Sequence, residues 1–188
     1  MSRFFKSIVE FNAVDPIGSL YENSNRLRGG STATESEKLV NIIAYCLNPN
    51  HYHLILEQLV DGGLSEFMRR LGGYTWYFNN KYDRSGALFQ GRFKAVHIGS
   101  NEYLLHVSAY VNLNDRVHFR GGSTATNFLS KSSWGEYVNK EIEGICEKEI
   151  ILGQFKNIDD YRGFALSSLE SIIQKKEELK GVAGLLLE

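Results

Sequence analysis

Apolar residues along the chain follow two different spacings, and each spacing predicts a different kind of element. The run Leu39–Leu47, LVNIIAYCL, is rich in β-branched and aromatic residues and is followed by Asn48–Asn50, so it predicts a buried strand that ends in a turn. His51–Leu59 is then its hairpin partner, and Phe93–Ile98 reads as a further short strand. The sheet would thus contain an antiparallel hairpin.

Helical spacing, with apolar residues three and four positions apart, occupies much of the remaining chain. Four helices are predicted in this way: residues 2–10, Leu64 to about Lys81, Asn101–Asn112 and Ile158–Lys180. Asn101 is the expected N-cap of the third helix, and Gly181 is the expected C-terminal stop of the fourth.

The composition fits one globular domain with an appended segment. The chain has 188 residues, of which 43% are hydrophobic, 12% aromatic and 23% charged, and this supplies enough apolar surface to fold. No apolar run approaches the roughly 20 residues of a membrane helix, and no secretory signal is visible, so we expect a cytoplasmic protein. Cys46 and Cys146 lack CxxC spacing and are expected to be reduced and structural.

The net charge of -1 conceals an uneven distribution of charged side chains. Residues 69–120 carry 8 basic and 3 acidic side chains, whereas residues 141–188 carry 6 basic and 10 acidic ones. Aromatic residues also crowd into the basic segment. Because basic groups hold phosphates and exposed rings stack on unpaired bases, this mixture suits single-stranded nucleic acid. Composition alone slightly favours the alternative, in which the rings face a core and the charges form a solvated surface.

One heptapeptide, RGGSTAT, occurs twice, at residues 28–34 and 120–126. Both copies fall in predicted loops, where insertions are tolerated. Two similar flexible loops would not need identical sequences. We therefore hypothesise that one short DNA repeat entered the gene twice in frame, which relatives that lack both copies without other gaps would support.

The sharpest local feature is the sequence Asn50-His51-Tyr52-His53 at the start of the second predicted strand. Alternate residues of a strand point to the same face, so His51 and His53 would lie side by side while Tyr52 faces away. Two neutral imidazoles can hold a divalent cation if a third ligand comes from elsewhere. The pattern also fits two half-exposed strand residues, or a zinc site that includes Cys46.

Four segments in order carry a resemblance to a known family: CLNPNHYHLIL, a helix containing FMRRL, YFNNKYDRSGALFQGRFKAV, and NEYLLHVSAYVNLN. Together they span roughly Leu39–Asp115 and resemble the IS200-like single-tyrosine transposases, including those associated with repetitive extragenic palindromes. In that family the histidine pair is the HUH motif, in which U is a bulky hydrophobic residue, here Tyr52, and the motif binds Mg or Mn. The resemblance thus implies His51 and His53 as metal ligands.

The resemblance also implies a nucleophile. The family's catalytic tyrosine lies on the helix after the last strand, in a pattern like YIHLNP, which corresponds to Tyr110 in YVNLND. The residue pattern alone would not choose Tyr110 over Tyr103. Asn114 then corresponds to a third metal ligand, and Asp115 stands where the family usually has proline. If the helix reaches Asn114, residues 110 and 114 share one of its faces.

The activity that the resemblance implies is metal-dependent nicking and rejoining of single-stranded DNA at hairpins, through a covalent 5'-phosphotyrosine. Arg92 and Lys94, together with Arg84 and Gln90, would grip the DNA backbone, although Arg92 and Lys94 equally fit a role in the solubility of a strand edge. Such a protein would associate with the nucleoid, as a monomer or as a homodimer with a composite active site. Two rival functions stay open: a catalytically weakened hairpin-DNA binding protein and a metal-binding structural protein.

The implied fold is α+β, a ferredoxin-like antiparallel sheet with helices on one face. The catalytic domain is predicted over residues 1–126 and a C-terminal helical extension over residues 127–188. Family members normally begin with a strand ahead of the helix that residues 2–10 resemble. The first strand of the sheet is therefore expected to be missing from this chain.

Overall fold

The structure, a computed structural model, has α+β architecture, as the sequence predicted. It describes residues 2–16, 18, 37–117 and 130–185, with side chains described as far as residue 175. Contacts divide the chain into two compact units. Unit 1 comprises residues 1–41 and 56–96, and unit 2 comprises residues 42–55 and 97–188.

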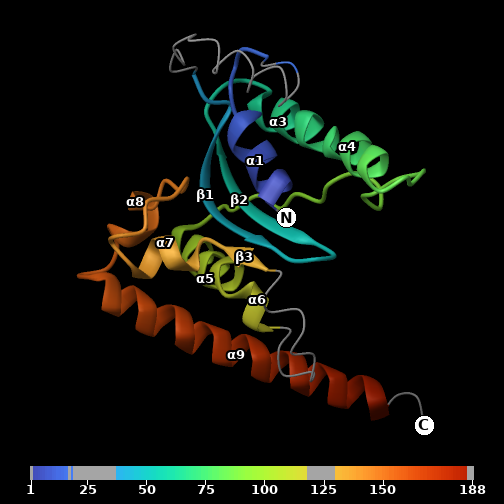
Figure 1. The fold of residues 1–188 in the computed structure, drawn as a ribbon. Helices are drawn as coiled ribbons and strands as arrows, with labels where there is room; N and C mark the ends of the chain where they lie inside the picture. The colour runs from blue at the N-terminus through green and yellow to red at the C-terminus, as the bar shows by residue number, and fades with distance from the viewer. Residues whose placement is uncertain (1, 17, 19–36, 118–129, 186–188) are drawn as a thin grey trace. The chain divides into compact units, whose positions relative to one another are not determined.

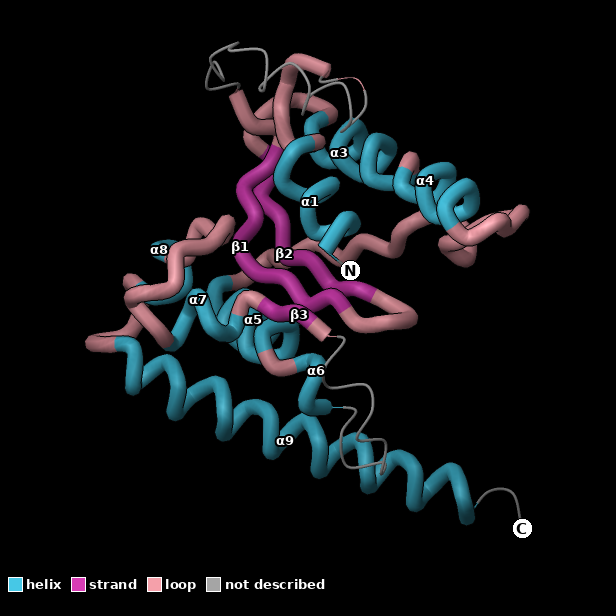
Figure 2. The backbone as a smooth tube through the Cα atoms, in the orientation of Figure 1, coloured by secondary structure: helices cyan, strands magenta, loops and turns pink. Residues whose placement is uncertain are grey.

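The sheet has three strands in the order β2-β1-β3, coloured magenta in Figure 2. These are β1 (Val40–Leu47), β2 (Tyr52–Gln58) and β3 (Lys131–Ser132). All side chains of β1 except one are buried, which explains its nearly continuous apolar sequence. A four-residue turn joins β1 to β2, and the Asn48 N–H donates to the His51 carbonyl across its base (2.9 Å). The pairing of β1 with β3 is antiparallel and joins Cys46 to Ser132 and Leu47 to Lys131.

Unit 2 is held together by an apolar core between its part of the hairpin and its helices. The helices are α5 (Asn101–Asn112), α6 (Asn114–Val117), α7 (Trp134–Val138), α8 (Glu149–Leu152) and α9 (Ile158–Leu185). The long α9 runs alongside α5 and also contacts α6 and α7 (Figure 1). Fully buried core side chains include Leu113, Tyr137 and Tyr161. Burial of apolar surface in such a core stabilises the fold by about 25 cal/mol per Å².

A chain of buried polar contacts crosses this core. The Tyr45 N–H of β1 donates to Ser133 Oγ (2.9 Å), and Ser133 Oγ donates to Asn112 Oδ1 on α5 (2.5 Å). Asn112 Nδ2 in turn donates to Tyr161 Oη on α9 (2.8 Å). Ser133 and Asn112 are both fully buried. The contacts therefore fix the end of α5 against both the central strand and the long helix.

The described residues of unit 1 include the helices α1 (Ser2–Glu10), α3 (Gly63–Gly72) and α4 (Tyr74–Lys81). Ile8 and Phe67 are fully buried here, and the Phe4 ring meets Tyr74 edge-on at 4.9 Å between centroids. The Arg70 side chain donates to Glu66 (2.6 Å) and to the carbonyl of Val14 (3.1 Å). A single arginine thus ties α3 to the segment that follows α1.

Four local predictions need correction. The helix expected over Leu64–Lys81 is interrupted at Gly73, because glycine weakens a helix by about 1 kcal/mol relative to alanine. The helix α5 is capped by Ser100, whose side chain accepts from the Tyr103 N–H (3.2 Å), not by Asn101. Gly181 does not end the last helix, which continues to Leu185.

The fourth correction concerns Phe93–Ile98, which forms no strand. Its residues are mostly exposed, and Val96 is 74% exposed. A short strand needs a neighbour for its backbone groups and a core for its apolar face. This segment gains too little from burial to form one.

Several predictions fall on residues outside those that the structure describes. Both RGGSTAT copies, at residues 28–34 and 120–126, lie there, and so does the predicted domain boundary between residues 126 and 127. Across the described parts of the chain, no helix is both long enough and apolar enough to cross a bilayer.

Replacing Ser133 by alanine should destabilise the chain. The substitution leaves Asn112 Oδ1 and the Tyr45 N–H without a shared buried partner, so we expect a loss of about 1–3 kcal/mol in the free energy of unfolding. Urea unfolding followed by circular dichroism measures the change. Ser171→Ala, at an exposed position of α9, is the matched control and should stay within about 0.5 kcal/mol of wild type. An equal effect of the two substitutions would contradict the role given to Ser133.

Candidate metal and nucleophile site

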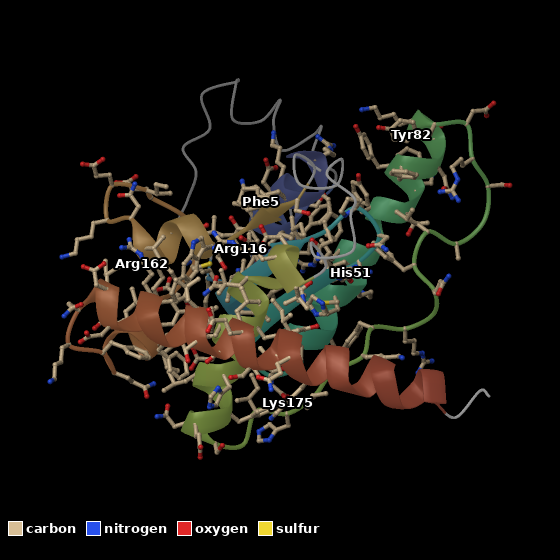
Figure 3. The ribbon with its side chains drawn as sticks, turned by 90° about the horizontal axis from the view of Figure 1, so that it is seen from below. Phe5, His51, Tyr82, Arg116, Arg162 and Lys175 are labelled. Carbon is tan, nitrogen blue, oxygen red and sulfur yellow. The ribbon has the colours of Figure 1, made fainter. Side chains whose placement is uncertain are left out.

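Two pieces of unit 2 that are distant in sequence meet at the candidate site. The hairpin contributes Asn48 and His51 from its turn and His53 from β2. The other side is the end of α5 with α6, which carry Tyr110 and Asn114. Figure 3 labels His51 together with Arg116 of α6. The structure therefore brings together the four residues expected to be metal ligands and nucleophile.

Hydrogen bonds on both sides of the His51 ring determine its tautomer. Nδ1 lies 2.7 Å from Asn50 Oδ1, which can only accept, and Nε2 lies 3.0 Å from Asn48 Nδ2, which can only donate. Both contacts are satisfied when Nδ1 carries the proton. Nε2 then presents a lone pair toward Asn48 and Asn114, which is the form of histidine that binds metals.

Two acceptor atoms face each other at this point. His51 Nε2 lies 3.2 Å from Asn114 Oδ1, and Asn48 Nδ2 lies within hydrogen-bond distance of both. Asn114 is fully buried, yet its Nδ2 atom has no hydrogen-bond partner in the described chain. The amide therefore directs its oxygen at His51 although its nitrogen is left unsatisfied. A pair of converging lone pairs suits a cation, so the donor set fits a divalent metal ion.

His53 connects the histidine pair to the tyrosine. The His51 and His53 rings meet edge to face with centroids 5.1 Å apart, which agrees with the same-face prediction. The His53 and Tyr110 rings are likewise edge to face, at 5.4 Å. Tyr103, seven residues earlier on α5, is 44% exposed. Geometry thus distinguishes Tyr110 from Tyr103, which the residue pattern did not.

A family model described as transposase IS200 like matches residues 21–114, half of the chain. The chain belongs to the IS200-like transposase family. The match includes the hairpin, α5 and Asn114, and so contains every residue of the site described above. Neither curated proteins nor solved structures gave a match to this transposase.

The helix of this IS200-like transposase that carries Tyr110 does not continue to Asn114. Helix α5 ends at Asn112, Leu113 leaves the helical conformation with φ -112° and ψ 13°, and α6 begins at Asn114. Residues 110 and 114 therefore do not share one uninterrupted helix. The Leu113 N–H still donates to Ala109, which keeps the two segments closely joined.

The alternative of a zinc site with Cys46 finds no support in the transposase. Burial, and secondarily the Asp115 carboxylate, raises the pKa of the Cys46 thiol to about 12. Burial also raises the pKa of Asp115. Within the described residues, no three His, Cys, Asp or Glu side chains gather as a metal site. The cysteines are free, as expected.

The four residues expected to contact DNA lie outside this cluster, in unit 1 of the transposase. Arg84, Gln90, Arg92 and Lys94 are all exposed and follow α4 in an irregular segment. Arg92 and Lys94 lie next to or within the segment that was wrongly predicted as a strand. The Arg84 guanidinium lies 5.6 Å from the centre of the Phe78 ring.

Sequence reasoning missed three polar residues around the site. Asn48 and Asn50 were interpreted only as turn formers beside Pro49, because asparagine and proline are common in turns. Ser130, whose hydroxyl donates to Asn48 Oδ1 (3.0 Å), precedes a strand of two residues that has no recognisable pattern. The available signal for Asn48 and Asn50 was their place on either side of Pro49, directly before His51 and His53.

Asn50→Ala should allow His51 to populate both of its neutral tautomers. In the wild type we expect a proton on Nδ1 and none on Nε2, because Asn50 Oδ1 accepts from the former. Nitrogen-15 NMR of the imidazoles in the metal-free protein distinguishes the two tautomers. The variant should show a mixture, whereas His97, an exposed histidine of unit 2, should be unchanged. An Nε2-protonated His51 in the wild type would contradict the assignment.

Proposed function

We propose that this IS200-like transposase is a metal-dependent enzyme that cuts and rejoins single-stranded DNA at hairpins through Tyr110. The observation that carries the proposal is the convergence of His51 Nε2 and Asn114 Oδ1, with the His53 ring in contact with both His51 and Tyr110. Ligand atoms for a cation and a tyrosine hydroxyl are the two components that such a reaction needs. The family match independently supports transposase activity.

The ligands we assign to the cation, Mg or Mn, are His51, His53 and Asn114. When bound, the cation supplies charge neutralisation at the scissile phosphate. Tyr110 Oη loses its proton and forms a bond to phosphorus while the bond to the 3' oxygen breaks, and that oxygen takes up a proton. The 5'-phosphotyrosine conserves the energy of the phosphodiester, so a second 3' hydroxyl can reverse the step without ATP.

Nucleophile and ligands are supplied by one chain in this arrangement. His53 and Tyr110 of the same molecule have ring centroids 5.4 Å apart, which favours a site completed within one subunit. A homodimer that exchanges the tyrosine between subunits would need to separate this pair. The reaction would take place at the nucleoid, where single-stranded DNA becomes available.

Tyr110→Phe should abolish the covalent intermediate, because the substitution removes the only atom that can form the bond to phosphorus. The purified chain is incubated with labelled single-stranded hairpin oligonucleotides from its own locus, with and without Mn²⁺. A denaturing gel then reports the protein-DNA adduct. We expect a metal-dependent adduct that is lost in Tyr110→Phe and in His51→Ala.

Tyr103→Phe is the matched control, since it removes an exposed hydroxyl from the same helix. It should leave the adduct at the wild-type level. An adduct that persists in Tyr110→Phe, or that is lost equally in Tyr103→Phe, would refute the assignment of the nucleophile.

Unit 1 contributes a surface suited to unpaired bases and phosphates. Trp76 on α4 is 74% exposed, and no residue of α4 is buried. Next to it, Arg3 lies 4.8 Å from the Tyr77 ring, and Lys81 lies 5.4 Å from the Tyr82 ring. Figure 3 labels Tyr82 near the end of this helix. An indole available for stacking, with cations held beside neighbouring rings, is the combination that single strands require.

Trp76 should report strand binding by fluorescence. The chain has two tryptophans, so Trp134→Phe, at a half-buried position, leaves Trp76 as the sole indole. Oligo(dT) should quench its emission, with an affinity that falls as salt rises. Trp76→Ala in the otherwise wild-type chain should weaken binding by about 1–3 kcal/mol, measured by anisotropy, and Trp76→Phe should restore most of it. Unchanged emission at saturating oligonucleotide would exclude stacking on Trp76.

The same surface favours a second candidate function, a hairpin-DNA binding protein that does not cut. It would bind through unit 1 without any need for the metal ligands. Strand binding without a covalent adduct under any metal condition would select this function over the first.

A further inference from the structure

Three polar atoms form a nearly equilateral triangle at the candidate metal site. Asn48 Nδ2 lies 2.8 Å from Asn114 Oδ1 and 3.0 Å from His51 Nε2, and the last two atoms are 3.2 Å apart. Of the residues that supply these three atoms, the family resemblance assigns ligand roles to His51 and Asn114, as it does to His53. Asn48 comes from the hairpin turn and has no assigned role.

The size of this triangle matches one face of an octahedron. Metal–ligand bonds of about 2.1 Å at right angles place neighbouring ligand atoms about 3.0 Å apart. The three measured separations, from 2.8 to 3.2 Å, are centred on that value. The three side chains therefore converge closely enough for one cation to contact an atom of each.

The Asn48 amide nitrogen donates to both partners, so its N–H groups lie between two lone pairs. A rotation of 180° about the Cβ–Cγ bond of Asn48 exchanges Nδ2 and Oδ1. The oxygen then lies where the nitrogen was, next to His51 Nε2 and Asn114 Oδ1. Its other contacts allow the exchange. Ser130 Oγ now donates to Asn48 Oδ1 (3.0 Å), and a hydroxyl can equally accept from an amide nitrogen. The Cys46 sulfur (3.8 Å) is a weak donor and a weak acceptor.

We infer that Asn48 is a further metal ligand of this site, one that joins His51 to Asn114 by hydrogen bonds and can turn its amide oxygen toward a bound cation. This inference rests on the proposed function only in assuming that a divalent cation binds between His51 and Asn114. Together with His53, the chain then supplies four ligands. A six-coordinate cation keeps two positions for phosphate oxygens or water.

Manganese binding in the absence of DNA tests the inference. Free Mn²⁺ is counted by electron paramagnetic resonance as the purified chain is titrated. We expect Asn48→Ala to weaken Mn²⁺ binding about tenfold or more, and Asn48→Asp to strengthen it by a similar factor, because a carboxylate is a stronger ligand than an amide. Asn41→Ala should bind as wild type does, since the Asn41 amide donates to Glu57 elsewhere on the hairpin.

A second readout does not depend on affinity. Electron–nuclear double resonance of the Mn²⁺-loaded chain, labelled with carbon-13 at the asparagine side-chain carbonyl, should show two strongly coupled carbons in the wild type. Asn48→Asp, which preserves the shape of the side chain, should retain one labelled carbon, that of Asn114. Asn48→Asp therefore still tests the inference if Asn48→Ala fails to fold.

The outcomes separate the two proposals. If the wild type binds no Mn²⁺, both the metal-dependent function and this inference fail. If the wild type binds and Asn48→Ala binds equally well or more tightly, Asn48 is a spacer or a competitor of the cation. The inference then falls while the proposed function stands.

Discussion

The buried hydroxyl of Ser133 is the contact on which the rest of unit 2 depends. It accepts from the backbone of Tyr45 on the central strand and donates to Asn112 at the last turn of α5. Apolar packing alone does not fix how far a helix slides along a sheet, because the hydrophobic effect is non-directional. A directional contact between buried groups does, since any slide would leave those groups without partners. Ser133 thereby joins the strand that precedes His51 to the helix that precedes Asn114.

The polar groups at the site carry a cost that the core offsets. In the described chain, three buried side-chain atoms have no hydrogen-bond partner, and two of them belong to the adjacent residues Asn114 and Asp115. An unsatisfied buried polar group typically costs about 1–3 kcal/mol. Such groups are few in natural proteins. Two of the three atoms therefore lie in α6, beside the Asn114 oxygen that faces His51.

Sequence reasoning succeeded where one local signal dominated. The strand from Val40 was evident because its residues are β-branched and buried on both faces, and the HxH spacing sufficed to place two imidazoles together. It failed where the outcome depends on a distant partner. Phe93–Ile98 has strand-like residues but pairs with no strand of the described sheet. Ser100 is the N-cap in place of Asn101 because the extended backbone lies at Ser100, one residue earlier than predicted. The contacts of Asn48 could not be foreseen, because its partners Asn114 and Ser130 lie 66 and 82 positions further along the chain.

The turn between β1 and β2 carries more than the change of chain direction. Its four residues, 48–51, include the amide that bridges the site, the acceptor that sets the His51 tautomer, and His51 itself. Turns of hairpins are ordinarily the places where evolution adds or removes residues freely. Here an inserted residue would change the spacing between Asn48 and His51, and a slip of β2 by one residue would turn His53 to the opposite face of the sheet. The length of this turn therefore matters to the geometry of the site as much as the identity of its histidines does.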